Sequence, residues 1–137
     1  SLLRNVKAPL VYSKVLVRDW KPWARLGVHE ISGPMSFYSR VKLDYPVSMG
    51  GYRHPRDPSE PIGLHRVHVP NESNAGMEAR DMFRIGRMKL LELSFADFEA
   101  RIRDELDRML GPGGFSSQRD IAAITAMPAF AAVCTIS

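Results

Sequence analysis

The stretch LVYSKVLVR at residues 10–18 decides the class of fold, because its side chains alternate with a period of two. β-branched and aromatic residues are frequent in it, as they are in strands. This pattern predicts a β-strand with one face turned to a core. One face would carry Val11, Ser13, Val15 and Val17, and the other would carry Tyr12, Lys14, Leu16 and Arg18.

Further strands are expected in the first half of the chain. Residues 28–31 suit a short strand, and residues 62–69 suit a longer one that is bracketed by two prolines. Residues 37–43 alternate as well, which places Phe37 and Tyr38 on opposite faces of a half-buried antiparallel strand. The strand-rich first half therefore predicts one sheet.

Two helices are expected in the second half, because apolar residues fall at helical spacing through residues 79–93 and 95–110. Ser94 suits an N-cap, with Asp97 at the capping-box position. Pairs of an acid and a base four residues apart predict a solvated helix face; they are Asp97–Arg101, Glu99–Arg103 and Asp104–Arg108. Residues 119–125 suit the start of another strand. The chain is thus predicted to be an α+β domain with an antiparallel or mixed sheet backed by two amphipathic helices.

A long connection at residues 44–61 separates two of the expected strands and is rich in proline and glycine. It has no regular period. Loops of this length are uncommon inside a compact domain, and those that occur often serve a function or contact a partner.

Length and composition narrow the class of protein. With 137 residues and 45% hydrophobic residues, the chain suits one ordinary domain. The net charge of +4 is dispersed, which argues against a nucleic-acid binder. No apolar run approaches the ~20 residues of a membrane span. The single cysteine, Cys134, excludes an internal disulfide and suits either the cytoplasm or the bacterial periplasm. The chain starts without methionine or a signal peptide, which suggests a start inside a longer protein.

Few residues suggest chemistry on their own. His65 and His68 lie three apart, and on a strand they would point to opposite faces, so no metal site is expected. The glycines at residues 111–114 follow a helix, where the dipole disfavours an anion, and they predict a helix stop rather than a phosphate loop. Aromatic residues gather in the first half, where they would form core or line a ligand cavity.

Several ordered segments carry a resemblance to a known family. They are KAPLVYSKVLVRDW (7–20), LGVH (26–29), VKLDYPVSMG (41–50), YR (52–53), FEARIRDEL (98–106), MLG (109–111), GGF (113–115) and RDIAAIT (119–125). Over residues 1–125 the chain resembles bacterial spermidine dehydrogenase-like proteins of the flavin amine oxidoreductase family.

The resemblance implies part of an enzyme. Such proteins bind FAD in a Rossmann-like domain, oxidise an amine by hydride transfer to the flavin, and roof the substrate cavity with a second domain of sheet and helices. Residues 1–125 look like that second domain. Its partners would be the FAD-binding domain of the same protein and a small amine. The expected lining residues are Tyr12, Phe37, Tyr38 and His65. Some members carry haem, for which His29 or another histidine would be the ligand.

Two departures from the family separate this chain from a complete enzyme. The Gly-x-Gly-x-x-Gly fingerprint of a dinucleotide site is absent. Residues 126–137 form a divergent apolar tail, which suits a fragment, a split gene or a frameshifted product. Two alternatives stay open: a cofactor-free binding module for an acidic partner, and a mis-framed product that forms a homo-oligomer through a sheet edge and its apolar tail.

Overall fold

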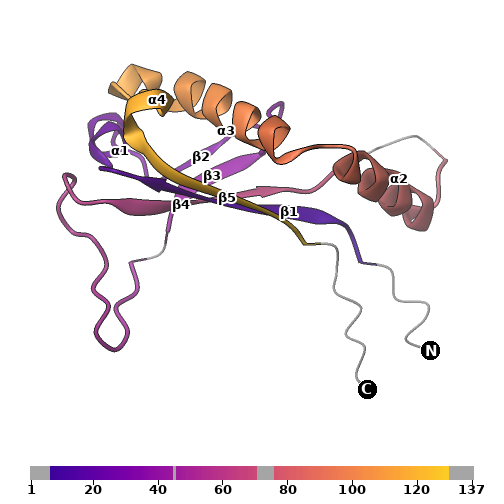
Figure 1. Ribbon diagram of the computed structural model, residues 1–137, viewed down its shortest axis with the longest axis horizontal. Coiled ribbons are helices and arrows are strands. Elements are labelled where there is room, and N and C mark those ends of the chain that lie inside the picture. The colour runs from indigo at the N-terminus through magenta and orange to yellow at the C-terminus, as the bar shows by residue number, and fades with distance from the viewer. Residues whose placement is uncertain (1–6, 45, 71–75, 130–137) are drawn as a thin grey trace.

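The strands within the described residues form one five-stranded antiparallel sheet in the order β2-β3-β4-β1-β5 (Figure 1). The computed structural model describes residues 7–44, 46–70 and 76–129. The strands are β1 (Leu10–Val17), β2 (Glu30–Ser32), β3 (Arg40–Leu43), β4 (Ile62–His68) and β5 (Ile121–Ala129). The predicted α+β class is confirmed.

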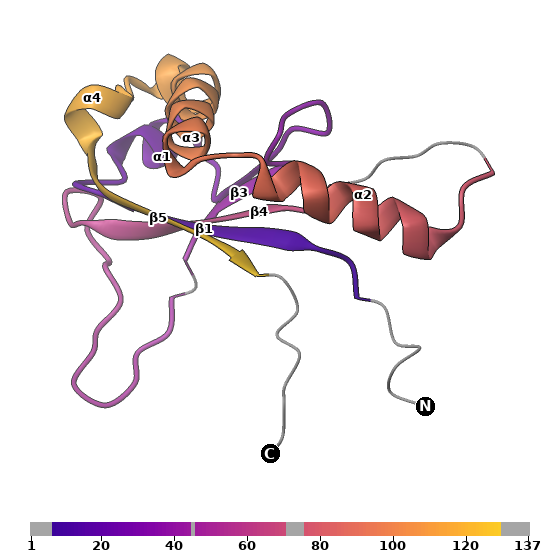
Figure 2. The same ribbon diagram turned by 45° about the vertical axis from the view of Figure 1, so that its right-hand side comes forward.

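The helices of the described part lie toward one face of this sheet (Figure 2). They are α1 (Lys21–Leu26), α2 (Ala79–Leu91), α3 (Phe95–Leu110) and α4 (Ser117–Asp120), with a 3-10 turn, η2, at Gly111–Gly113. The loop between β3 and β4 extends to the other side. No helix of the described residues combines the length and the apolar character that a bilayer crossing requires.

The core lies between the sheet and α3. The predicted alternation of β1 is confirmed, because Val11, Ser13, Val15 and Val17 are buried whereas Tyr12 and Leu16 are 40% and 44% exposed. The buried face meets an apolar stripe of α3 made of Phe98, Ile102, Leu106 and Leu110. This burial is the main favourable term for a domain of this size.

The start signal of α3 was also predicted correctly. Ser94 and Asp97 form a full capping box at the start of α3. Two of the three expected ion pairs are present, Glu99–Arg103 at 2.6 Å and Asp104–Arg108 at 2.7 Å. The guanidinium of Arg101 lies over the Phe37 ring instead, 4.7 Å from its centroid.

The strand predicted at residues 37–43 begins only at Arg40, so this prediction was wrong at its start. Tyr38, which alternation placed on the face of Arg40, is fully buried. The reason is that the backbone N–H groups of Phe37 and Tyr38 donate to the Glu105 carboxylate on α3 rather than to a neighbouring strand. These residues therefore turn toward the helix layer.

The same carboxylate is an exception to the solvated face that the acid–base pairs of α3 predicted. Glu105 is 3% exposed and pairs with Arg66 of β4, whose side chain is completely buried. Arg66 also donates to the Ile102 carbonyl at 3.2 Å and stacks 4.4 Å from the centroid of the Tyr38 ring. The Tyr38 hydroxyl lies 2.6 Å from Ser13 Oγ, and burial raises the pKa of this phenol.

β5 continues to Ala129 and pairs with β1 as far as Leu10. The strand that was expected to start at residues 119–125 thus runs past residue 125, where the family resemblance ends. Pro128 lies in β5, an edge strand of the sheet, where a residue without an N–H is tolerated. The remainder of the tail, residues 130–137, lies outside the described residues.

The substitution Glu105→Ala should lower the free energy of unfolding by about 3 kcal/mol or more, because it leaves the buried Arg66 without its counter-charge. Asp104→Ala is the matched control, since it removes the exposed Asp104–Arg108 pair beside Glu105. It should lower the free energy of unfolding by less than about 1 kcal/mol. Urea unfolding followed by circular dichroism measures both. Equal losses in the two variants would contradict the central role of this pair.

Candidate functional site

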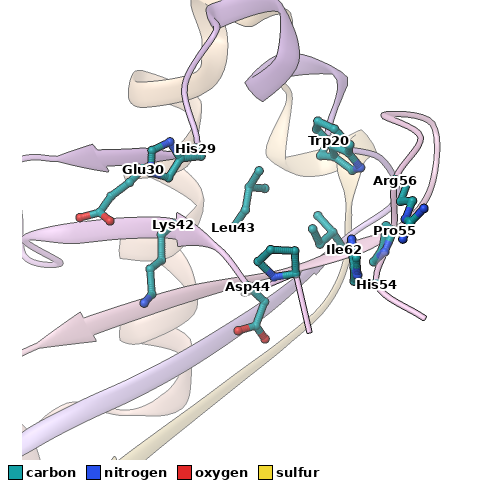
Figure 3. A pocket seen from close by; sticks show the side chains of 11 residues that line it. Trp20, His29, Glu30, Lys42, Leu43, Asp44, His54, Pro55, Arg56 and Ile62 are labelled. Carbon is teal, nitrogen blue, oxygen red and sulfur yellow. The ribbon is translucent and has the colours of Figure 1, made fainter. Parts of the chain in front are cut away.

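A cavity of about 680 Å³ opens at the end of the sheet where β3 ends and β2 and β4 begin (Figure 3). Strand ends, the residue before α1 and the β3–β4 loop all contribute to it. The lining residues are Trp20, His29, Glu30, Lys42, Leu43, Asp44, Pro46, His54, Pro55, Arg56 and Ile62. Its volume is in the range of small-molecule sites.

The β3–β4 loop is held in place by its own hydrogen bonds and by one bond to the residue before α1. The Glu60 carboxylate accepts from the backbone N–H groups of Arg56 and Asp57 at 2.8 and 2.9 Å. The backbone N–H of Trp20 donates to the Pro58 carbonyl at 2.9 Å. A long loop thereby becomes one wall of the cavity.

The charged side chains of this cavity differ in whether they form ion pairs within the described residues. The two carboxylates of the cavity, Glu30 and Asp44, each form an ion pair. Arg40 Nε lies 2.9 Å from the Glu30 carboxylate, and Lys14 Nζ lies 2.7 Å from that of Asp44. By contrast, the guanidinium of Arg56 makes no hydrogen bond or ion pair within the described residues. The acidic groups are satisfied while at least one strong donor is available.

Two further side chains with ring nitrogens line the cavity. The Trp20 indole nitrogen is buried without a hydrogen-bond partner among the described residues. The Ser48 hydroxyl lies 3.0 Å from Nδ1 of His54, which leaves Nε2 available. Figure 3 shows Trp20, His54, Pro55 and Arg56 together on one side of the cavity, with Glu30 and Lys42 on the other.

The open face of the sheet adjoins this cavity. Tyr12 and Leu16 expose apolar surface there, and the Tyr12 ring meets the His65 ring edge-on at 5.3 Å. His65 pairs with Lys14 on β1 and with Lys42 on β3. Partial burial, followed by these two cations, lowers the pKa of the His65 imidazole below its ordinary value of 6.5.

The four expected lining residues lie on the two sides of the sheet. Tyr12 and His65 share the open face, whereas Phe37 and Tyr38 lie on the helix side. Phe37 stacks on His68 with ring centroids 3.7 Å apart, and both border a second cavity of about 410 Å³. The structure does not bring the four together, and none of them lines the larger cavity.

Sequence reasoning missed Trp20, His54 and Arg56 as neighbours around one cavity. Only the irregular, proline-rich segment at residues 44–61 signalled that a site involves this loop. His29, considered above as a haem ligand, also lines the cavity. Nothing in periodicity shows which side chains of such a loop face inward.

Two sequence features considered above for metal and phosphate chemistry have a clear position in the structure. His65 and His68 point to opposite faces of β4, as predicted. Within the described residues, no three His, Cys, Asp or Glu side chains gather as a metal site. Among the glycines after α3, Gly113 is required by packing, because a Cβ there would lie 2.6 Å from the Pro22 carbonyl oxygen.

No family model matches the chain, and no curated protein matches it.

The substitution Gly113→Ala should lower the free energy of unfolding by about 1–3 kcal/mol, because the added methyl group collides with the backbone of α1. Gly111→Ala is the control in the same turn, since a Cβ there meets nothing within 4 Å and φ is −51°. Its change should stay within about 0.5 kcal/mol. Thermal unfolding of the two variants decides whether Gly113 is required by packing.

The lowered pKa of His65 predicts a pH-dependent stability. Below pH 6.5 the unfolded chain binds a proton that the folded imidazole resists, so stability present above pH 6.5 is lost as the pH falls. His65→Asn should flatten this part of the profile. The measurement is the urea midpoint between pH 7.5 and 5.5, and identical slopes in the two proteins would refute the assignment.

Proposed function

We propose that this chain is the substrate-domain portion of a FAD-dependent amine oxidoreductase, similar to spermidine dehydrogenase-like proteins, and that it is inactive alone. The observation that supports the proposal is the one-sided packing of the sheet. Helices cover one face, and the other face exposes Tyr12 and Leu16 beside a long loop. Such a face suits burial against a second domain.

In this proposal the open face would roof the flavin cavity of the FAD-binding domain. Tyr12 and His65 would line that roof, and the exposed apolar surface would exclude water from the reacting amine. The flavin would supply the redox chemistry, while this chain would contribute shape and orientation.

Within the described residues, the glycine-rich turn after α3 does not fit the binding of FAD itself. The glycine-rich turn after α3 is packed against α1, and the Arg25 side chain donates to the Gly113 carbonyl at 3.1 Å. It follows a helix C-terminus, so it presents carbonyl groups rather than N–H groups. The cofactor therefore belongs to the partner domain in this proposal, and no step of the reaction is assigned to these residues.

The alternative, a binding module for an acidic partner, has weaker support. Three basic side chains, Lys14, Arg40 and Lys42, project from the strands of the open face, whereas Arg18 donates to the Arg119 carbonyl of α4. Lys14 and Arg40 are already paired with Asp44 and Glu30. An acidic partner would have to compete with those carboxylates.

The test is the intact mass and visible absorption spectrum of the protein purified from its native source by an antibody against this chain. The expected result is a mass well above 15.4 kDa together with the visible bands of an oxidised flavin. A mass equal to that of these residues, with no visible absorption, would overturn the proposal.

A further inference from the structure

We propose that the cavity at the end of the sheet binds a small organic carboxylate with an apolar body. Its acidic group would lie on the side formed by Trp20, His54 and Arg56. This site is separate from the flavin cavity proposed above, and the argument for it does not depend on a flavin.

The donors on that side of the cavity favour an anion. The Arg56 guanidinium is a planar fork that suits a carboxylate, and it has no partner within the described residues. The Trp20 side chain also lines this side, and its buried indole N–H has no partner among the described residues. His54 adds an imidazole nitrogen that Ser48 does not occupy.

The carboxylates of the cavity do not oppose this charge. Glu30 and Asp44 are each neutralised by a cation, Arg40 and Lys14 respectively. In Figure 3 the Glu30 carboxylate points away from Trp20 and Arg56, and the Asp44 carboxylate points out of the same region. A cationic amine would therefore have to displace an existing ion pair, whereas an anion would not.

Apolar side chains define the rest of the ligand. Leu43 and Ile62 come from the ends of β3 and β4, and Pro46 and Pro55 come from the loop. Together with the flat Trp20 ring they suit an aromatic or branched aliphatic group. A cavity of about 680 Å³ accommodates a molecule of that size.

Benzoate and benzylamine provide the test, because they share a ring and differ in charge. The full chain, labelled with ¹⁵N, gives two indole N–H resonances, from Trp20 and Trp23. The variant Trp20→Phe assigns them. Benzoate should shift the Trp20 resonance in a saturable manner and leave the resonance of the core residue Trp23 unchanged. Benzylamine should not shift the Trp20 resonance.

Two matched arginine variants locate the carboxylate. Arg56→Ala should weaken benzoate binding about tenfold, as expected for the loss of a charged hydrogen bond. Arg53→Ala removes an exposed arginine of the same loop that does not line the cavity, and it should change the affinity less than about twofold. An unshifted Trp23 resonance in both variants shows that the core is intact.

Three outcomes would overturn this inference: no saturable shift with benzoate, tighter binding of benzylamine than of benzoate, or equal losses in the two arginine variants. None of them bears on the flavin experiment. If the holoenzyme contains flavin but its cavity does not bind benzoate, the proposed function stands and the carboxylate site is rejected.

Discussion

The buried ion pair between Arg66 and Glu105 is the constraint on which the arrangement of sheet and helix depends. It joins the central strand β4 to the middle of α3. Charges taken out of water are tolerated only when each is paired and hydrogen-bonded. Here Glu105 also accepts backbone N–H groups of Phe37 and Tyr38, and Arg66 also reaches the Ile102 carbonyl. One fixed rotation of α3 about its axis brings the Glu105 carboxylate and the Ile102 carbonyl to the two terminal nitrogens of Arg66, while its Nε has no partner among the described residues. The pair therefore specifies how the helix lies on the sheet.

The position of the helix layer in turn explains the short β2–β3 hairpin. Because residues 37–38 donate to a helix carboxylate, they are withdrawn from the sheet, and β3 pairs with β2 only from Ser32↔Arg40 to Glu30↔Lys42. The hairpin therefore covers only part of the sheet edge. The strand ends lie beside Trp20 and the β3–β4 loop, and the larger cavity forms between them.

The sequence predicted the elements whose residues interact with near neighbours in the chain. The alternation of residues 10–18 and the Ser94–Asp97 capping box depend on local geometry, and both are confirmed. Acid–base pairs surround Glu105 and predicted a solvated helix face, so the burial of this residue was not predicted. A signal was nevertheless present: Glu105 follows Ile102 by three residues and Phe98 by seven, on the apolar stripe, while Arg66 shares the inward parity of Leu64 on its strand. Opposite charges on two inward faces predict a buried pair.

The cavity could not be predicted in the same way, because its residues come together only in the tertiary structure. Trp20, His29 and Arg56 come from a strand exit, a strand entry and an irregular loop, so no period relates them. The folding energy resides mainly on the helix side of the sheet, where the apolar stripe and the buried pair lie. The open face and the loop carry exposed rings and an unpaired guanidinium that contribute little to that energy. Side chains that are not needed for folding can be arranged to bind a ligand or a partner domain. Because the helix side of the sheet stabilises the fold and the loop end contributes little to its stability, function is expected at the loop end.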